Sequence, residues 1–359
     1  MEAAASTTRR PAPSFLPATA VLEMTYRCNH ACLFCSCPWL DPENDFDQRP
    51  ELSIDEWKQA VARLGSLGCT SFAFTGGEAL LKPGLLGLIE SAAKLTVEHV
   101  ETVDGELRSQ FGPPKLFLLS NGKAMSDEVL RFCAIHNVHL SLSLPGLRAF
   151  PELTQGGTTA ADILGWFRRA KELGVGTTAG VTVTALNIDE LYETLAEALL
   201  AGADSILLNR FLPGGRGLQH ADRLSLAPAD IPRMLDIAEE VLQTAKRWGN
   251  VGTELPKCLF DASRYERLSV GSRCSAARDF FVVGPSGYLR VCNHSPVRLV
   301  HLDHLDELPA HPEWQRFVFK DYLPGPCAGC PTRLDCDGGC REAARVVTGR
   351  PDGMDPALA

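Results

Sequence analysis

The stretch AVLEMTYRCNHACLFC, residues 20–35, joins a short apolar run to three closely spaced cysteines. Residues 20–25 are apolar enough to form a buried β-strand. Cys28, Cys32 and Cys35 follow on one loop with the spacing C-x3-C-x2-C. A [4Fe–4S] cluster normally binds four thiolates, so three cysteines leave one iron free to bind a small molecule. The alternative is a zinc knuckle, although zinc sites favour C-x2-C pairs and closed sets of four ligands.

Beyond this loop, the chain to about residue 210 alternates short β-rich runs with longer helical patterns. This alternation is typical of repeated βα units around a parallel sheet. Six units are too few to close an eight-stranded barrel, so we expect a curled α/β sheet that stays open on one side and can admit a large substrate. The six strands, buried on both faces, are expected at residues 20–25, 70–75, 115–120, 138–144, 177–184 and 204–210.

Three helices have recognisable starts. Ser53 with Glu56 forms a capping box that predicts a helix over residues 54–67. Asn187 with Glu190 predicts a similar start for a helix that continues through residue 200, and Ser126 predicts a third N-cap. Residues 95–114 are charged and end in Gly-Pro-Pro, which predicts an insertion before the third strand.

The composition excludes several classes of protein. The 359 residues carry a formal net charge of −9, which argues against a nucleic-acid partner because phosphate-binding surfaces are basic. No apolar run approaches the roughly 18 residues that a membrane span needs. Residues 1–19 contain an Arg pair, but three prolines interrupt any apolar signal segment, so we expect a loose tail. Thirteen cysteines without an export signal predict metal ligation in a reducing cytoplasm.

The cysteine triplet resembles the signature of the radical S-adenosylmethionine (SAM) superfamily, C-x3-C-x-aromatic-C after the first strand of a partial (βα)6 barrel. Phe34 fills the aromatic position. The resemblance implies that Cys28, Cys32 and Cys35 hold a [4Fe–4S] cluster whose open iron chelates SAM. Reduction of the cluster would cleave SAM to methionine and a 5′-deoxyadenosyl radical. Cys37 lies outside the pattern and is expected to be a bystander.

Polar residues at the ends of the following strands are candidates for SAM binding. They are Gly76, Gly77 and Glu78 after the second strand, Ser120 and Asn121 after the third, and Ser143 after the fourth. The first three resemble the family's Gly-Gly-Glu segment, in which glycines allow close backbone approach and the carboxylate suits the SAM ammonium. An ordinary role in strand-end turns is the alternative. The family often has an arginine that pairs with the SAM carboxylate, but Gln155-Gly156-Gly157 stands in that region here. Arg168 is the candidate for this role.

A second group of cysteines follows a change in composition after residue 210. Cys274 is followed by twelve residues, Gly287, four residues and Cys292, and a C-x2-C-x5-C-x3-C run ends at Cys340. These spacings resemble the SPASM extension, a loop-rich domain of radical SAM maturases that carries two auxiliary Fe–S clusters, expected here as [4Fe–4S]. Residues 280–283 and 288–291 predict a hairpin that brings Cys274 and Cys292 together.

The resemblance implies which late cysteines share a cluster. The first auxiliary cluster is expected to bind Cys258, Cys274, Cys292 and Cys340, and the second Cys327, Cys330 and Cys336. The family's further cysteine after Cys340 is absent, so Asp352, Asp355, water or a substrate group is expected as the last ligand. Zinc at all seven cysteines is the alternative. Cys69 and Cys133 are expected to be buried apolar residues.

The resemblance also implies a function. We expect an oxygen-sensitive enzyme that forms a C–C or thioether crosslink in a ribosomally made precursor peptide, with an auxiliary cluster as electron acceptor. Arg210, Asp279 and Tyr288 are the candidates for the catalytic residue. A peptide epimerase, a sulfatase-type protein maturase and a small-molecule radical dehydrogenase are the alternatives. Asn293 disfavours the sulfatase type, which has aspartate there, and the seven late cysteines disfavour the dehydrogenase. A non-catalytic metal-binding protein would need neither the open triplet nor Gly-Gly-Glu.

The expected organisation is a tail over residues 1–19, a radical SAM barrel over residues 20–250 and a SPASM domain over residues 251–359. A flavodoxin or ferredoxin is expected to supply electrons. About 20 residues precede the first strand, too few for a leader-binding domain at that end. Leader recognition is therefore expected from the barrel, the tail or a separate leader-binding protein.

Overall fold

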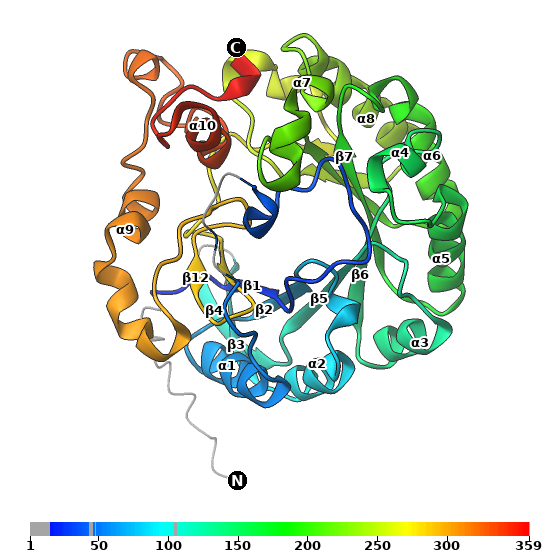
Figure 1. Ribbon diagram of the computed structural model, residues 1–359, viewed down its shortest axis with the longest axis vertical. Helices are drawn as coiled ribbons and strands as arrows, with labels where there is room; N and C mark the ends of the chain where they lie inside the picture. Colours follow the sequence, from blue (N-terminus) through cyan, green and yellow to red (C-terminus); the bar gives the residue numbers. More distant parts are fainter. Residues whose placement is uncertain (1–14, 43–45, 47, 104–105, 359) are drawn as a thin grey trace.

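The computed structural model describes residues 15–42, 46, 48–103 and 106–358, so most of the expected tail over residues 1–19 lies outside the described residues. The main sheet has ten strands in the order β10-β9-β8-β7-β6-β5-β2-β1-β11-β12. All neighbouring pairs are parallel except β11 and β12. Figure 1 shows this sheet curled into an arc with helices on its outer side. The predicted α/β fold with an open, curled sheet is confirmed.

The six predicted strands are neighbours in the centre of the sheet. They are β1 (Thr19–Glu23), β2 (Ser71–Thr75), β5 (Lys115–Ser120), β6 (Val138–Ser143), β7 (Thr177–Val183) and β8 (Ser205–Arg210). The sheet continues beyond β8 with β9 (Trp248–Val251) and β10 (Leu268–Ser269), and beyond β1 with β11 (Phe280–Val283) and β12 (Leu289–Arg290). The predicted hairpin is confirmed as β11 and β12. The parallel pairing of β11 with β1 was not predicted, and it places strands from both sides of residue 250 in one sheet.

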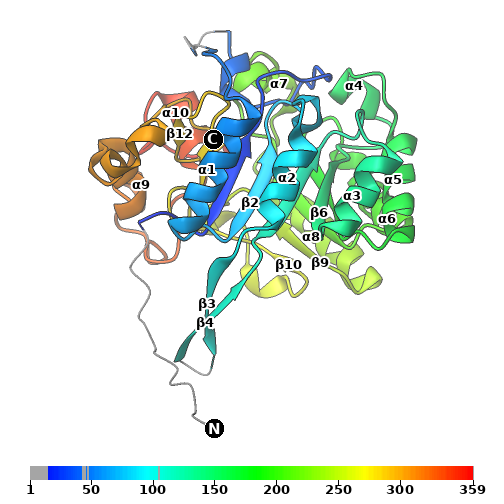
Figure 2. The same ribbon diagram turned by 90° about the horizontal axis from the view of Figure 1, so that it is seen from below.

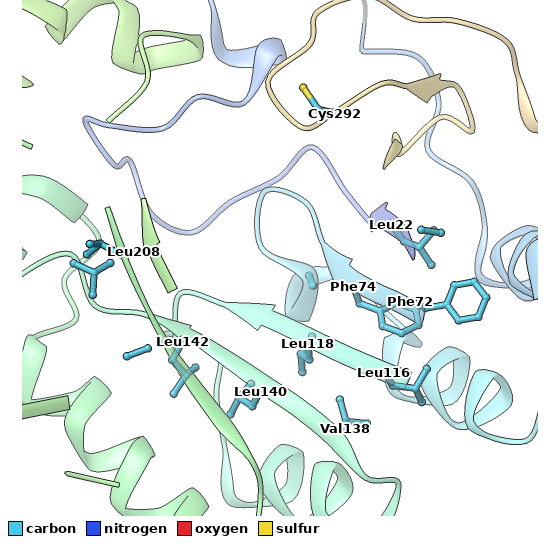
Figure 3. Close-up of a cluster of buried hydrophobic side chains, with 14 of the residues drawn as sticks. Leu22, Phe72, Phe74, Leu116, Leu118, Val138, Leu140, Leu142, Leu208 and Cys292 are labelled. Atoms are coloured by element: carbon cyan, nitrogen blue, oxygen red, sulfur yellow. The ribbon is translucent and has the colours of Figure 1, made fainter. Parts of the chain in front are cut away.

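The expectation that these strands are buried on both faces is wrong. Along β1, β2, β5, β7 and β8, fully buried residues alternate with partly exposed ones. The buried set, which includes Leu22, Phe74 and Leu118, forms one hydrophobic layer with helix residues such as Trp57 (Figure 3). Residues of the other face, such as Val21 and Leu119, line a cavity instead.

The helices follow the expected pattern with one correction. They are α1 (Ile54–Ser66), α2 (Leu85–Ala93), α3 (Asp127–Ile135), α4 (Phe150–Thr154), α5 (Ala160–Glu172), α6 (Leu191–Ala201), α7 (Ala221–Leu224), α8 (Asp230–Ala245), α9 (Pro312–Phe319) and α10 (Arg341–Thr348). The capping box of Ser53 and Glu56 is present, and Ser126 caps α3 through the N–H of Val129.

The predicted capping box of Asn187 and Glu190 is wrong. A short 3₁₀ turn, Ile188–Glu190, precedes α6, and the Asn187 side chain makes no cap hydrogen bond to it. It accepts instead from the backbone N–H of Thr184 at 2.7 Å. The buried Glu190 carboxylate accepts hydrogen bonds from the backbone N–H groups of residues 147–149, which belong to another loop. The Asn187 amide also donates to the Pro145 carbonyl, so partners outside the helix compete successfully with the local cap.

The predicted insertion is a two-stranded antiparallel sheet made of β3 (Val97–Val103) and β4 (Glu106–Gly112). Figure 2 shows it projecting away from the body of the molecule. It exposes Leu107 and Phe111, at 73% and 67% of their surface. Among the described residues, no helix combines the length and hydrophobicity that crossing a bilayer requires.

Candidate active site

The cysteine triplet lies at the carboxyl end of β1, beside the ends of β2, β5 and β6. Cys28, Cys32 and Cys35 share the wall of a cavity of about 190 Å³ with Gly77, Glu78, Ser120, Asn121 and Ser143. Ligands of open parallel sheets bind at this edge. The structure therefore brings together the predicted cluster cysteines and nearly all of the predicted SAM-binding residues; Gly76 lies just behind the wall.

Two glycines allow the end of β2 to pack against the cysteine loop. The N–H groups of Gly77 and Glu78 donate to the carbonyls of Thr25 and Arg27, each at 2.9 Å. A Cβ atom on Gly77 would collide with the Arg27 carbonyl, and Gly76 has a φ of +136°, which other residues rarely adopt. The Gly-Gly pair is thus required to support the loop that carries the cysteines.

The loop after β8 supports the triplet from the other side. The N–H of Gly217 donates to the carbonyl of Cys35 at 3.0 Å. Gly215 has a φ of +52°, and a side chain there would meet the backbone of Cys35 and Cys37. The Gly-rich sequence after residue 210 therefore packs directly on the cysteine loop.

Glu78 is 2% exposed and holds neighbouring strand ends together. Its carboxylate accepts hydrogen bonds from the Ser120 hydroxyl at 2.9 Å, the Asn121 N–H at 2.8 Å and the Leu80 N–H at 3.1 Å. Burial raises the pKa of this carboxyl above its ordinary value, against the lowering effect of these hydrogen bonds. A cationic group in the cavity would favour its ionised form.

The thiols of the triplet differ in their surroundings. Burial raises the pKa of Cys28 and of Cys32, whereas a hydrogen bond with the Cys37 thiol lowers the pKa of Cys35. Cys37, expected to be a bystander, is therefore in contact with the triplet. The His30 N–H and the Asn121 amide lie 3.5 and 3.7 Å from the Cys28 sulfur, where they can donate to a thiolate.

His30 was missed as a site residue, although it lies inside the cysteine motif. Its ring lines the cavity, with Nε2 2.7 Å from the Thr158 hydroxyl, and its buried Nδ1 has no hydrogen-bond partner among the described residues. Gly156 stands in the region of the family's arginine, and a Cβ atom there would overlap the His30 ring. Arg168 is exposed on α5, away from the cavity wall.

The donors on this wall fit a SAM-binding cluster. Three thiols face one space together with a buried carboxylate, a hydroxyl, an amide and an orphaned imidazole nitrogen. The thiols suit iron, and the polar groups suit the ammonium and hydroxyl groups of a nucleoside-linked amino acid.

A larger cavity, of about 450 Å³, continues from this one along the inner face of the sheet. The two cavities share Phe34, Cys35, Thr75 and Leu119. At its far side the larger cavity is lined by the buried residues Cys274, Cys292 and Cys340. The interior of the curled sheet therefore connects the cysteine triplet with part of the C-terminal cysteine group.

Of the three predicted catalytic residues, only Arg210 lines this larger cavity. It is buried and forms an ion pair of 2.5 Å with Asp355. The placement of the other two is corrected: Asp279 is exposed, and Tyr288 packs against His301 outside the cavity wall.

Two carboxyl groups on the wall were missed by sequence reasoning. Burial raises the pKa of both Glu254 and Glu342. Glu254 accepts a hydrogen bond from the Ser275 N–H at 2.9 Å, and Glu342 has one buried oxygen with no hydrogen-bond partner among the described residues. Neither belongs to a motif, so only the folded chain reveals them.

The remaining cysteines lie elsewhere. Cys327, Cys330 and Cys336 are partly exposed, while Cys69 and Cys133 are buried in the hydrophobic core, as predicted. Cys258 is exposed and absent from the cavity wall. The N–H of its neighbour Lys257 points at the Cys336 sulfur, 3.5 Å away. The segment that carries Cys258 therefore lies beside Cys336, and the grouping of Cys258 with Cys274, Cys292 and Cys340 stays a prediction.

Comparison with known proteins agrees with this geometry. The model of the radical SAM superfamily matches residues 22–198, which include the triplet and the ends of the strands that surround it. Residues 22–198 form a radical SAM domain. This radical SAM protein is also 25% identical to the PqqA peptide cyclase of Rhodopseudomonas palustris, over 96% of its own length and 87% of the relative.

Solved structures share the fold of this radical SAM enzyme. Streptococcus suis SuiB bound to its precursor peptide SuiA superposes with a TM-score of 0.66 at 16% identity, covering 96% of this chain and 76% of SuiB. The structure of anSMEcpe with bound AdoMet superposes with a TM-score of 0.65 at 18% identity, covering 95% of this chain and 92% of anSMEcpe. The shared fold extends across the C-terminal region as well as the barrel.

Proposed function

We propose that this radical SAM enzyme is a maturase that removes hydrogen from an unactivated carbon of a ribosomally made peptide and forms a C–C or thioether crosslink. The observation that carries the proposal is the continuous interior described above. The cavity that holds the triplet opens into a larger one, which has three C-terminal cysteines and two carboxyl groups on its wall. The name of the Rhodopseudomonas relative, a peptide cyclase, supports a peptide substrate.

At the triplet, we assign cluster ligation to Cys28, Cys32 and Cys35. Glu78 would bind the SAM ammonium, while Ser120, Asn121 and Ser143 would bind its other polar groups, with Gly76 and Gly77 bringing the backbone close. When bound there, SAM on a reduced cluster supplies a radical that can take a hydrogen atom from an unactivated carbon. The protein holds the cofactor at the end of the sheet and keeps the reacting carbon away from water.

At the larger cavity, we propose that Cys274, Cys292 and Cys340 hold one auxiliary cluster and that the outer cysteines hold a second. The oxidation removes two hydrogens, one as an atom and one as a proton, with an electron that needs an acceptor. Glu254 and Glu342 lie where they can take up the proton, and a raised pKa makes a carboxylate a better base. Zinc at these cysteines is the alternative, and metal analysis of the purified chain separates the two.

The domain division at residue 250 and the partners remain part of the proposal. We assign SAM cleavage to residues 20–250 and the auxiliary clusters to residues 251–359. A flavodoxin or ferredoxin would supply electrons, and a separate protein would present the leader of the peptide. An epimerase would leave the peptide mass unchanged, so product mass separates it from a crosslinking enzyme.

The test is turnover with a peptide encoded beside the gene. We expect the anaerobically reconstituted enzyme to form 5′-deoxyadenosine and a peptide lighter by two hydrogens, measured by liquid chromatography and mass spectrometry. An unchanged mass with solvent deuterium at an α-carbon would instead identify an epimerase. Absence of 5′-deoxyadenosine from a chain loaded with iron and SAM would refute the radical chemistry itself.

A further inference from the structure

The position of Cys258 changes which C-terminal cluster lacks a cysteine ligand. The segment that carries it packs on the outer cysteines rather than on the cavity wall. The Lys257 N–H lies 3.5 Å from the Cys336 sulfur, and the Lys257 ammonium lies 3.9 Å from the Asp335 carboxylate. Cys258 therefore follows directly after a residue that touches the C-x5-C part of the outer run.

A glycine makes this approach possible. Gly339 has a φ of +90°, and a Cβ atom there would meet both Pro256 and the Asp355 carboxylate. A side chain at this position would collide with the Asp355 carboxylate and crowd Pro256, the first residue of the segment 256–258. The Gly338-Gly339 pair before Cys340 thus has a packing role that the spacing of the cysteines does not reveal.

Exposure separates the seven late cysteines into the same two sets. Cys274, Cys292 and Cys340 are buried and line the larger cavity, whereas Cys258 is exposed and the outer three are partly exposed.

The carboxylates that were candidates for the missing ligand already have partners. Asp355 is fully buried and accepts hydrogen bonds from the N–H of Cys340 at 2.6 Å and from Arg210 at 2.5 Å. Asp352 pairs with Arg350 at 2.9 Å. Asp355 therefore positions the backbone of Cys340 and is not a free iron ligand.

We propose that Cys258, Cys327, Cys330 and Cys336 are the four protein ligands of the outer cluster, and that the inner cluster has only Cys274, Cys292 and Cys340. This inference rests on the proposed function, since it requires both auxiliary clusters. The missing ligand then belongs to the inner cluster, whose open position faces the larger cavity and is available to an exogenous donor. The cluster near the surface is closed, and the cluster beside the substrate space is not.

The grouping is tested in a full chain in which Cys28, Cys32 and Cys35 are replaced by alanine, here called the parent chain. Cys258→Ala, Cys330→Ala and Cys292→Ala are each added to this parent chain. Iron and sulfide content, with Mössbauer and EPR spectra, report the two auxiliary clusters without any need for turnover. We expect Cys258→Ala to lose or alter the same signal as Cys330→Ala, and Cys292→Ala to lose the other. Because Cys258 is exposed, its substitution leaves the fold intact.

Two results would contradict this. If Cys258→Ala altered the signal that Cys292→Ala removes, the grouping would be wrong although the proposed function would stand. If the parent chain held no iron–sulfur cluster, the proposed auxiliary sites would fail together with the inference.

The open position is tested by adding cyanide to the same reduced parent chain. We expect the inner signal to shift and the outer signal to stay unchanged, since only the inner cluster has a position without a protein ligand. An inner signal that shifts only after Glu254→Gln would overturn the open position and identify Glu254 as the ligand that closes it. A shift of the outer signal would overturn the closed four-cysteine set.

Discussion

The triplet and the C-terminal cysteines are held in opposite ways. Cys28, Cys32 and Cys35 lie on one loop, which is fixed by backbone hydrogen bonds to the ends of neighbouring strands. Cys274, Cys292 and Cys340 come from segments far apart in the chain, and buried carboxylates position the backbone of two of them. Asp337 accepts from the Cys274 N–H at 2.7 Å, and Asp355 accepts from the Cys340 N–H.

This difference determines which substitutions would disrupt each site. A ligand set on one loop depends on the few contacts that shape the loop, and it is independent of the rest of the chain. A set gathered from several segments depends on every packing contact that brings those segments together. The following predictions test whether the two regions are as separable as their construction indicates.

The largest effect is expected for Cys32→Ala. Loss of one thiol from the triplet should abolish 5′-deoxyadenosine formation, because only two of the three proposed protein ligands of the cluster would remain. Both auxiliary clusters should remain, since their ligands lie on other segments, and iron counting with Mössbauer spectroscopy measures this. Cys133→Ala, at a buried cysteine in the core, is the control and should keep SAM cleavage. Retained cleavage in Cys32→Ala would refute the assignment of the triplet.

Cys330→Ala should have the converse effect. This cysteine is partly exposed and far from the triplet in the chain, so SAM cleavage should continue. The crosslinked peptide should disappear, because oxidation of the substrate needs the electron acceptor that the C-terminal region is proposed to hold. Product mass and 5′-deoxyadenosine are measured in the same reaction. Wild-type product formation by a folded variant that lacks only this cluster would contradict that role.

A smaller effect is expected for Glu78→Ala. Loss of a charge-assisted hydrogen bond to the SAM ammonium should weaken binding by about 1.5–3 kcal/mol, or roughly ten- to a hundredfold in Kd. Calorimetric titration with SAM measures this. Glu78→Gln keeps the size of the side chain but removes its charge, so it serves as the control for positioning alone. An unchanged Kd in Glu78→Gln would show that Glu78 acts only by holding the strand ends.

The smallest effect is expected for Gly77→Ala, which tests the support of the cysteine loop. The added methyl group would meet the Arg27 backbone, and such overpacking typically costs about 1–3 kcal/mol. The matched control is Gly87→Ala, where nothing lies within 4 Å of the added atom inside α2; it should stabilise by roughly 0.5–1 kcal/mol. Denaturant unfolding of the two variants measures both changes. Similar stabilities would mean that the loop tolerates displacement.

The local features of this protein follow from the sequence by itself. The spacing of Cys28, Cys32 and Cys35, the alternation of six strands with helices, and the caps at Ser53 and Ser126 all depend on neighbouring residues. The position of Glu78 at the end of β2 follows in the same way, because parallel strands present their carboxyl ends at one edge. These features could be predicted since their geometry is set within a few residues.

Only the tertiary structure decided the rest. Asn187 and Glu190 have the residue types of a capping box, yet the Asn187 amide bonds to Thr184 and Pro145 and the Glu190 carboxylate bonds to another loop. The pairing of β11 with β1 brings the C-terminal segment back beside the first strand, and this return places Cys274 and Cys292 on the cavity wall. The spacing of the cysteines does not reveal where Cys258 lies, because its position depends on how residues 256–258 pack against Gly339. Contacts between distant segments depend on the packing of the whole chain, so they cannot be predicted from the number of residues between cysteines.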